Sequence, residues 1–288
     1  FAGPVDAMDK RIFDFSDSRL LAGAAALYEL NVVAGTDGFS FLAADPTGAI
    51  LTLKAWHFDN YDGGFEQADT DLRAILASES VLQSAFSRVR CAVFNREATL
   101  VPRRLFNPDA LNSYFQLLLP PGDYEYGYEA LPNLDCYLVY ALDKRVGDLL
   151  LKYLSVQNIT HLASPLLQKA LDVVSIDATA VVVNLRNEVA QVMAFERGNL
   201  LFYNTFSFDK AGDLLYYVLL AYDQCRLSPD RIPVWLAGEA LPDAEIYKQL
   251  YRYIRQIRFV AAPTNYHWPA EAPPVPEHMF FDLFCLKS

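Results

Sequence analysis

The sequence predicts an α/β protein made of two similar lobes with a small α+β subdomain inserted between them. Residues 28–58 have the pattern of a three-strand meander, and residues 179–208 repeat this pattern in register 150 residues later. Gly48 and Gly198 mark the second break of each copy. Sequence with helical periodicity follows each meander. Such a duplication is typical of two lobes related by pseudo-symmetry, and we expect a ligand site in the cleft between them.

The first lobe is predicted to span residues 1–122. Its meander is followed by a polar loop, a helix at 65–79 and a strand at 88–94, in which apolar residues alternate with other residues. An Asn-Pro pair gives the signal of a helix start, so a further helix is expected at 107–119. Residues 98–106 fit neither the helical nor the strand periodicity well, and we interpret them as an extra hairpin strand.

The inserted subdomain and crossover are predicted to span residues 123–175, because two prolines and a glycine break the chain just before them. Asp143 is expected to cap a helix in which apolar residues recur at helical spacing. The elements expected here are two strands that face each other at 124–130 and 136–142, a helix over 146–153, a strand at 159–163 and a helix at 164–171.

The second lobe is predicted to span residues 176–288. Asp209 is expected to cap the helix that follows its meander. The stretch 263–276 contains five prolines, which exclude a helix and most ladder pairing, so we expect an extended loop. The other elements expected after the meander are a helix to 225, a strand at 232–237, a helix at 242–256, a strand at 257–261 and a last strand at 279–286.

The composition indicates an ordered protein with a large core. The chain has 288 residues, of which 53% are hydrophobic, and a formal net charge of −11. This charge argues against nucleic acid as a partner, because binding to a phosphate backbone depends on cationic charge. The apolar runs fall short of the roughly 20 residues that span a bilayer, so no transmembrane segment is predicted. Four separated cysteines and no visible secretory signal favour a cytoplasmic location.

The sequence contains none of the familiar motifs for phosphate loops, dinucleotide sites, hydrolase elbows or zincins. Its four histidines are isolated, so we interpret them as structural and predict no metal site. Acidic residues between Asp59 and Asp71 miss the spacing of an EF-hand and are interpreted as a solvated loop. Arg252, Arg255 and Arg258 are interpreted as a solvated helix face rather than an RNA-binding stripe.

Two stretches carry a family resemblance, CYLVYALDKRVGDLLLKYLSVQNITHLASPLLQKAL at 136–171 and AVVVNLRNEVAQVMAFERGNLLFYNTFSF at 180–208. With the order of elements, they resemble the actin-like ATPase superfamily, whose two ribonuclease-H-like lobes are each built on a three-strand meander with ATP bound between them. The actin-like proteins of pilus assembly and type II secretion are the most similar, together with an uncharacterised bacterial family assigned that fold. The resemblance implies this fold for most of residues 28–261.

The resemblance also implies where a nucleotide would bind. In active members the first turn of each meander carries Asp-x-Gly, in which the carboxylate helps to hold a metal-bound water and glycine lets the backbone approach phosphate. The first turn here keeps small residues and one acid in a shifted order, and Gly238 remains from the Gly-Gly adenosine signature. The cofactor-binding candidates are therefore Gly35, Thr36, Asp37, Gly38 and Gly238.

The second turn, at 184–188, has no glycine, and Glu188 would repel phosphate, so we expect no phosphate binding there. At the other positions, a purely structural role is the alternative to ligand binding. Asp37 is interpreted by default as a hairpin-turn residue, because Asp-Gly is a favoured type I′ pair. Gly238 is interpreted as the end of a strand, and Arg186 as a surface turn residue. No residue is predicted to be catalytic.

The favoured function is therefore that of a non-catalytic actin-like protein, a pseudo-ATPase that binds an unidentified protein partner as a scaffold and needs no cofactor. The alternative is a divergent nucleotide-binding ATPase or phosphotransferase that uses ATP and Mg²⁺ with Asp37 and a second acid of the cleft. The aromatic loop 265–269 is the best candidate for a segment that contacts a partner or clamps the lobes, with plain packing as the other interpretation.

Overall fold

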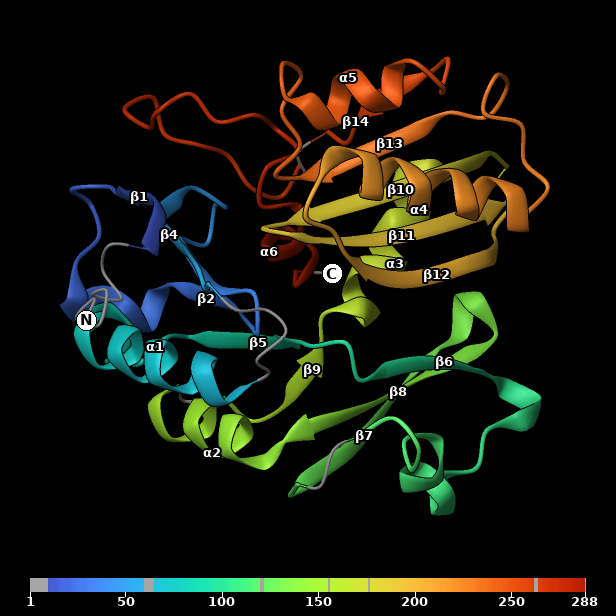
Figure 1. Cartoon of the computed structure of the whole chain (residues 1–288). Helices are drawn as coiled ribbons and strands as arrows, with labels where there is room; N and C mark the ends of the chain where they lie inside the picture. Colours follow the sequence, from blue (N-terminus) through green and yellow to red (C-terminus); the bar gives the residue numbers. More distant parts are fainter. Residues whose placement is uncertain are drawn as a thin grey trace, which may run out of the picture.

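The computed structural model describes residues 10–59, 65–119, 122–154, 156–175, 177–261 and 264–287. Its strands form three sheets (Figure 1). The first-lobe sheet contains, in spatial order, β1 (Arg11–Ser16), β4 (Ile50–His57), β3 (Gly38–Ala44), β2 (Glu29–Gly35), β5 (Arg88–Phe94) and β9 (Ile159–His161). The second-lobe sheet contains β12 (Asn199–Ser207), β11 (Val189–Glu196), β10 (Thr179–Arg186), β13 (Val234–Gly238) and β14 (Ile257–Phe259). The small sheet contains β6 (Ala98–Pro102), β8 (Cys136–Asp143) and β7 (Tyr124–Leu131).

The two large sheets have the same topology, which confirms the predicted duplication. The order β4-β3-β2-β5-β9 in the first lobe corresponds to β12-β11-β10-β13-β14 in the second. In both, the meander is antiparallel and the next two strands are parallel to its first strand. Gly48 and Gly198 have φ angles of 88° and 80°, a left-handed conformation that favours glycine. The fold is thus α/β with two related lobes.

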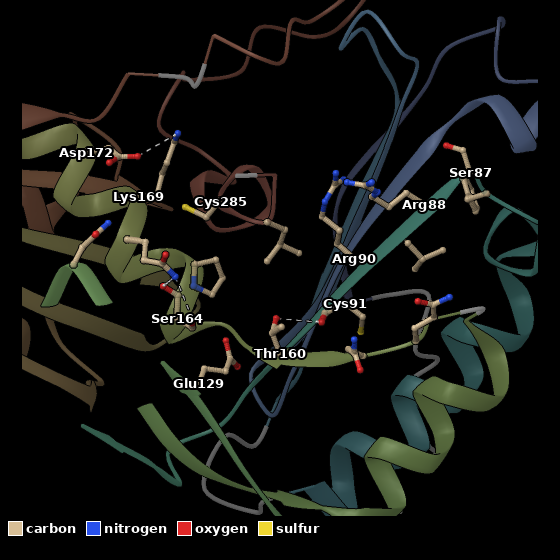
Figure 2. A pocket seen from close by; sticks show the side chains of 18 residues that line it. Ser87, Arg88, Arg90, Cys91, Glu129, Thr160, Ser164, Lys169, Asp172 and Cys285 are labelled. Atoms are coloured by element: carbon tan, nitrogen blue, oxygen red, sulfur yellow. Dashed lines mark hydrogen bonds and ion pairs between the residues drawn. The ribbon is translucent and has the colours of Figure 1, made fainter. Parts of the chain in front are cut away.

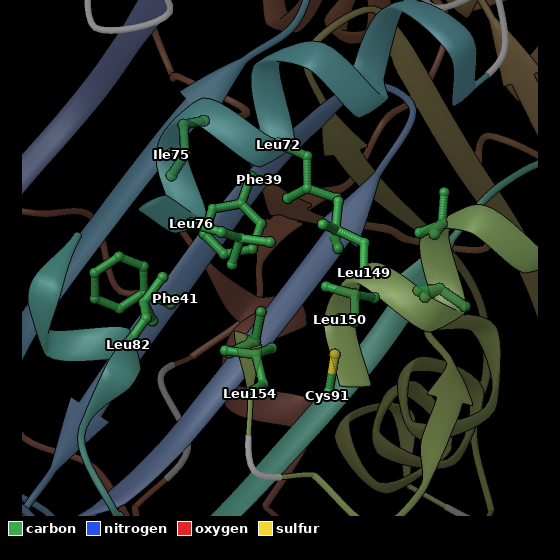
Figure 3. Close-up of a cluster of buried hydrophobic side chains, with 14 of the residues drawn as sticks. Phe39, Phe41, Leu72, Ile75, Leu76, Leu82, Cys91, Leu149, Leu150 and Leu154 are labelled. Atoms are coloured by element: carbon green, nitrogen blue, oxygen red, sulfur yellow. The ribbon is translucent and has the colours of Figure 1, made fainter. Parts of the chain in front are cut away.

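A pair of helices covers one of the two faces of each large sheet. In the first lobe, α1 (Phe65–Ser78) and α2 (Lys144–Tyr153) pack against the sheet through leucine and isoleucine side chains. Figure 3 shows these side chains next to Phe39 and Phe41 of β3. In the second lobe, α4 (Ala211–Gln224) and α5 (Glu245–Tyr251) contribute to the corresponding cluster. Each lobe therefore has a hydrophobic core of its own.

The segment 279–286, which we expected to be a strand, instead contains the short helix α6 (Phe281–Cys285). Phe281 and Cys285 lie in the hydrophobic cluster of the second lobe, whereas Leu283 and Phe284 lie in a cluster with first-lobe residues. A helix can send apolar side chains to two sides, and a short apolar run does not distinguish helix from strand. The prediction was wrong because both sides of α6 are buried between the lobes (Figure 1).

Several predicted helix ends also needed correction. The expected helix at 107–119 is a 3-10 helix, η6 (Pro108–Tyr114), with a kink at Ala110. Lys210, not Asp209, is the N-cap of α4, because the Asp213 carboxylate accepts a hydrogen bond from the Lys210 N–H at 3.1 Å. The expected helix at 242–256 is limited to α5. By contrast, Asp143 caps α2 as predicted, accepting from the Arg145 N–H at 2.9 Å.

Strand pairing links segments on both sides of residue 122. The extra strand expected at 98–106 is present as β6, and it pairs with β8 in the small sheet. The strand β9 pairs with β5 and so belongs to the first-lobe sheet, although it follows the small sheet in the chain. The helix α3 (Ala163–Val174) then packs against the second lobe. The domain limits at 122 and 175 stay a prediction, but these pairings bring the chain from the first lobe through the small sheet and back.

Candidate functional site

The first turns of the two meanders meet between the lobes. Asp37, Gly38 and Gly238, three of the predicted site residues, line a cavity of about 20 Å³ together with Arg186 and Glu239. A cavity of this size holds about one water molecule, since a water needs roughly 10–15 Å³ by this kind of measure. Three of the five residues predicted from the sequence therefore lie together, around a space that protein side chains largely fill.

Gly35 and Thr36, the other two predicted residues, lie beside this cavity in the backbone that leads into the turn. The Thr36 N–H donates to the carbonyl oxygen of Phe94 at 3.3 Å, and the Thr36 side chain is buried. A Cβ on Gly35 would lie 2.1 Å from Oδ1 of Asp37, so glycine is needed where the Asp37 carboxylate folds back. Both residues shape the turn, and neither lines the cavity.

Arg186 connects the two turns through a buried ion-pair network. Its Nε donates to Oδ2 of Asp37 at 2.8 Å, and its Nη1 donates to the Asp282 carboxylate of α6. Arg186, Asp37 and Asp282 are only 9%, 1% and 4% exposed. The guanidinium also lies 5.8 Å from the ring centre of Phe94. Arg186 is therefore not the surface turn residue that we expected, because it is the buried last residue of β10. Asp37 lies in the hairpin turn between β2 and β3, as expected, and in addition forms an ion pair with Arg186.

The charges of this network are not balanced. Burial by itself would lower the pKa of the Arg186 guanidinium, but the carboxylates of Asp37 and Asp282 raise it above its usual value, so the group stays charged. Burial raises the pKa of Asp37, and the nearby guanidinium offsets only part of that increase. One cation cannot neutralise two carboxylates, and Glu239 adds a further acid to the cavity wall. The site therefore repels additional negative charge.

Asn187 and Glu239 add a second set of contacts across the turns. The Asn187 Nδ2 group donates to the carbonyl oxygens of Asp37 and Phe58, each at 3.2 Å. The Asn187 N–H donates to Oε2 of Glu239 at 3.0 Å, and Oε1 of Glu239 lies 2.8 Å from Nε2 of His57. Glu239, which follows Gly238 in the chain, thus joins the lobes through its contact with His57 of β4.

Gly238 has a structural reason to be glycine. Its φ is +73°, and a Cβ there would lie 2.0 Å from the carbonyl oxygen of Leu185. Its N–H donates to the carbonyl oxygen of His278 at 2.8 Å. This geometry agrees with the interpretation of Gly238 as the end of strand β13.

The aromatic loop at 265–269 contacts the first lobe, although it follows the last strand of the second-lobe sheet in the chain. His267 exchanges backbone hydrogen bonds with Gly48 and Ile50, each at 3.0 Å. Tyr266 accepts a hydrogen bond from Nδ2 of Asn31 at 2.7 Å, and Trp268 packs edge-on against aromatic side chains of β1. These contacts favour the interpretation of the loop as a clamp between the lobes.

One histidine and part of the acidic segment have structural partners. His161 is fully buried and hydrogen-bonded to Asn95, and burial lowers its pKa to about 4. Lys10 lies 3.0 Å from both Asp59 and Asp71 of the acidic segment. Part of that segment, including its Gly-Gly turn, lies outside the described residues. In the described part of the chain, no group of three His, Cys, Asp or Glu residues is placed to hold a metal ion.

Sequence reasoning did not find the role of Asp282. The residue lies in a segment expected to be a strand, and it comes 245 positions after Asp37, so nothing local connects the two. The pairing of His57 with Glu239 was missed for the same reason. Only the placement of α6 between the lobes brings these residues to the first turn.

A much larger cavity, of about 840 Å³, lies on another side of the molecule. One wall is the beginning of β5, and the opposite wall is α3, so we call it the β5–α3 groove (Figure 2). Cys285 and Leu286 at the end of α6 also line it, as does Glu129 of β7. Its volume falls in the range of about 300–1,000 Å³ that is usual for ligand sites.

The fold and the inter-lobe site define the class of the protein, which has the actin-like ATPase fold. A protein of this fold and unknown function from Bacteroides thetaiotaomicron VPI-5482 is 19% identical, with a TM-score of 0.72 over 84% of this chain and 94% of that chain. A chain of the PilM–PilN type IV pilus biogenesis complex is 13% identical, with a TM-score of 0.52 over 84% of this chain and 90% of that one. These similarities confirm the fold that the resemblance implied.

Within this class, the chain belongs to the family described as protein of unknown function DUF3822, whose model matches residues 17–257. No curated protein matches the sequence. Among the described residues, no helix is both long and apolar enough to cross a membrane.

Proposed function

We propose that this protein is a non-catalytic actin-like protein, a pseudo-ATPase whose two lobes form a scaffold for a protein partner. The observation that carries the proposal is the position of Arg186. Its guanidinium lies between Asp37 and Asp282, next to the turn that approaches phosphate in active members of the superfamily. The phosphate position is thus filled by a side chain that is itself tightly held.

Nucleotide binding at this position would carry a large cost. A triphosphate would have to displace a buried guanidinium from two carboxylates, and it would leave those carboxylates without a cation. An unpaired buried charge costs several kcal/mol, about 3–5 when one partner of a buried pair is removed. The phosphate charge would also face Glu239 and its neighbours. We therefore propose that the protein uses no nucleotide cofactor.

A role in protein binding is supported by the rest of the surface. The β5–α3 groove is far larger than the inter-lobe cavity, at about 840 Å³ against about 20 Å³. The related structure of PilM is a complex with PilN, so a protein of this fold assembles with another protein. We place the protein in the cytoplasm, in line with its four free cysteines.

The cofactor part of the proposal is tested by thermal unfolding with and without MgATP. A ligand with a Kd of about 50 μM, added at about 5 mM, stabilises the native state by about 2.7 kcal/mol and raises Tm by several degrees. We expect a shift below about 1 °C, because the site has no room for phosphate. A reproducible rise of several degrees that Asp37→Ala removes would support a nucleotide-binding enzyme instead.

The scaffold part is tested by affinity capture at native expression level, with quantification of the captured proteins by mass spectrometry. The expected result is one protein retained in near-equal amount to the bait. Retention of chaperones and abundant background proteins alone would contradict the scaffold role.

A further inference from the structure

The β5–α3 groove has an open strand edge along one wall. β9 pairs with β5 only from Cys91 to Val93, whereas β2 pairs with β5 from Arg88 onward. In the described part of the chain, no strand pairs with the outer edge of β5 at residues 88–90. The same residues line the groove. The sheet edge therefore ends inside a cavity rather than against another element.

The backbone of this edge is directed into the groove. The carbonyl oxygens of Cys91 and Val93 accept hydrogen bonds from the β9 side, from Thr160 Oγ1 and from the Leu162 N–H. Alternate residues of a strand direct their backbone groups to the same neighbour, so the N–H and C=O of Val89 point to that side too. An extended segment placed in line with β9 would pair with these groups. Addition of a strand to an open edge is a common mode of peptide recognition.

The side chains above this edge are mainly cationic. Figure 2 shows Arg88 and Arg90 on one side of the groove and Lys169 on the other. Arg88 is exposed, and its side chain has no ion pair within the described residues. Arg90 is held by Glu29 at 3.3 Å, and Lys169 lies 3.7 Å from Asp172. Arg88 is thus a cationic side chain of the groove without an ion pair among the described residues, in a protein whose net charge is −11.

The acids of the groove do not neutralise this cation. Asp172 is next to Lys169 on α3. Glu129 lies lower in the groove, where it accepts a hydrogen bond from the His161 N–H at 2.7 Å. Burial raises the pKa of Glu129, although this hydrogen bond and one from Ser164 act in the opposite direction. Neither acid forms an ion pair with Arg88.

We propose that the β5–α3 groove binds an extended, acidic segment of a partner protein, which adds as a strand to the edge of β5 and places a carboxylate on Arg88. The inference rests on the proposed scaffold function and names its binding site and the chemistry of its partner. Because the groove lies between β5 of the first lobe and α3, which packs on the second lobe, the segment would contact both lobes.

The test uses the full chain labelled with ¹⁵N and four synthetic probe peptides. The first is an extended peptide in which aspartate alternates with valine. The second has asparagine in place of each aspartate, the third has lysine, and the fourth is the aspartate peptide with alternate backbone nitrogens methylated. The asparagine peptide keeps the shape and removes the charge, and the methylated peptide keeps the charge and blocks strand pairing.

The aspartate peptide is expected to cause saturable amide shifts at Ser87–Cys91 and at Gln168 and Lys169. The asparagine peptide should bind roughly fivefold more weakly, and the lysine peptide more weakly still, because a partly exposed ion pair is lost. Methylation should abolish the shifts along β5. The Arg88→Gln variant should reduce the preference for aspartate, whereas Arg252→Gln, at an exposed site on the end of α5, should leave it unchanged.

The proposal is overturned if no saturable shift occurs at these residues up to about 1 mM peptide, well above the micromolar affinity expected for a short specific segment. It is also overturned if the asparagine and methylated peptides bind as well as the aspartate peptide. Either result leaves the MgATP measurement unaffected, so failure of this site is distinguishable from failure of the pseudo-ATPase proposal.

Discussion

Replacement of Arg186 by methionine tests the buried network between the lobes. Arg186→Met keeps much of the apolar stem and removes the guanidinium that joins Asp37 to Asp282. Both carboxylates are more than nine-tenths buried, so solvent cannot replace the lost cation. Removing one partner of such a pair costs about 3–5 kcal/mol of unfolding free energy at neutral pH.

The cost should depend on pH in a defined direction. Burial raises the pKa of Asp37 above its value in the unfolded chain. Between these two values the native state holds a proton that the unfolded state has released, so the native state is favoured at low pH and loses this advantage as the pH rises. Without Arg186 the pKa of Asp37 should rise further. The variant should therefore be closest to wild type near pH 4 and furthest from it near pH 8.

The assay is urea unfolding, followed by the fluorescence of the three tryptophans, among them the buried Trp56, and by circular dichroism. Coincident transitions are the check for two-state behaviour. A triple variant, Arg186→Met with Asp37→Asn and Asp282→Asn, is the matched control, because it removes the unpaired charges. It should recover about 2 kcal/mol or more relative to the single variant. A loss of less than about 1 kcal/mol in the single variant, or a triple variant no more stable than the single one, would contradict the stabilising role of the buried ion pairs.

Three further predictions concern stability. Gly238→Ala should lower the free energy of unfolding in urea by about 2–3 kcal/mol, because Gly238 has a positive φ and lies close to the Leu185 oxygen. Gly212→Ala in α4, where a Cβ would meet nothing within 4 Å, should be neutral or stabilising. Equal effects of the two substitutions would contradict the strain at Gly238. Burial lowers the pKa of His161 from 6.5 to about 4, so between these pH values the imidazole binds a proton in the unfolded chain but not in the native state. The free energy of unfolding should therefore fall by about 3 kcal/mol as the pH drops from 6.5 to 4. His161→Asn should flatten this pH dependence, and an unchanged slope would exclude His161 as its source. Tyr266→Phe should cost about 1–2 kcal/mol in thermal or urea unfolding by removing an acceptor from buried Asn31, and no loss would argue against the loop as a clamp.

The duplicated fold could be predicted because its signals are local and repeated. The offset of 150 residues aligns Gly48 with Gly198, and the structure gives both glycines a left-handed turn conformation. The strand over 88–94 was predicted with its correct ends, because its apolar residues alternate in one short run. These features depend on neighbours in the chain, which a single sequence displays.

The contents of the inter-lobe site could not be predicted in the same way. The sequence places Asp37 in the first turn, but Arg186, with which it forms an ion pair, is 149 positions away, and Asp282, which contacts Arg186, is 245 positions away. Arg186 is the charged last residue of the apolar strand β10, and nothing in the adjacent sequence indicates that it is buried. The sequence of α6 is a short apolar run that is compatible with a helix or a strand, so the position of Asp282 depends on tertiary packing alone.

A pseudo-ATPase of this kind has no room for a nucleotide between the two turns. Isothermal titration of the wild-type protein with MgATP, up to about 2 mM, measures this directly, since a functional site would have a Kd well below that concentration. We predict no saturable heat above dilution. A saturable one-to-one binding curve that disappears in Asp37→Ala would contradict the account, because it would require Arg186 to leave its two carboxylates to admit a triphosphate.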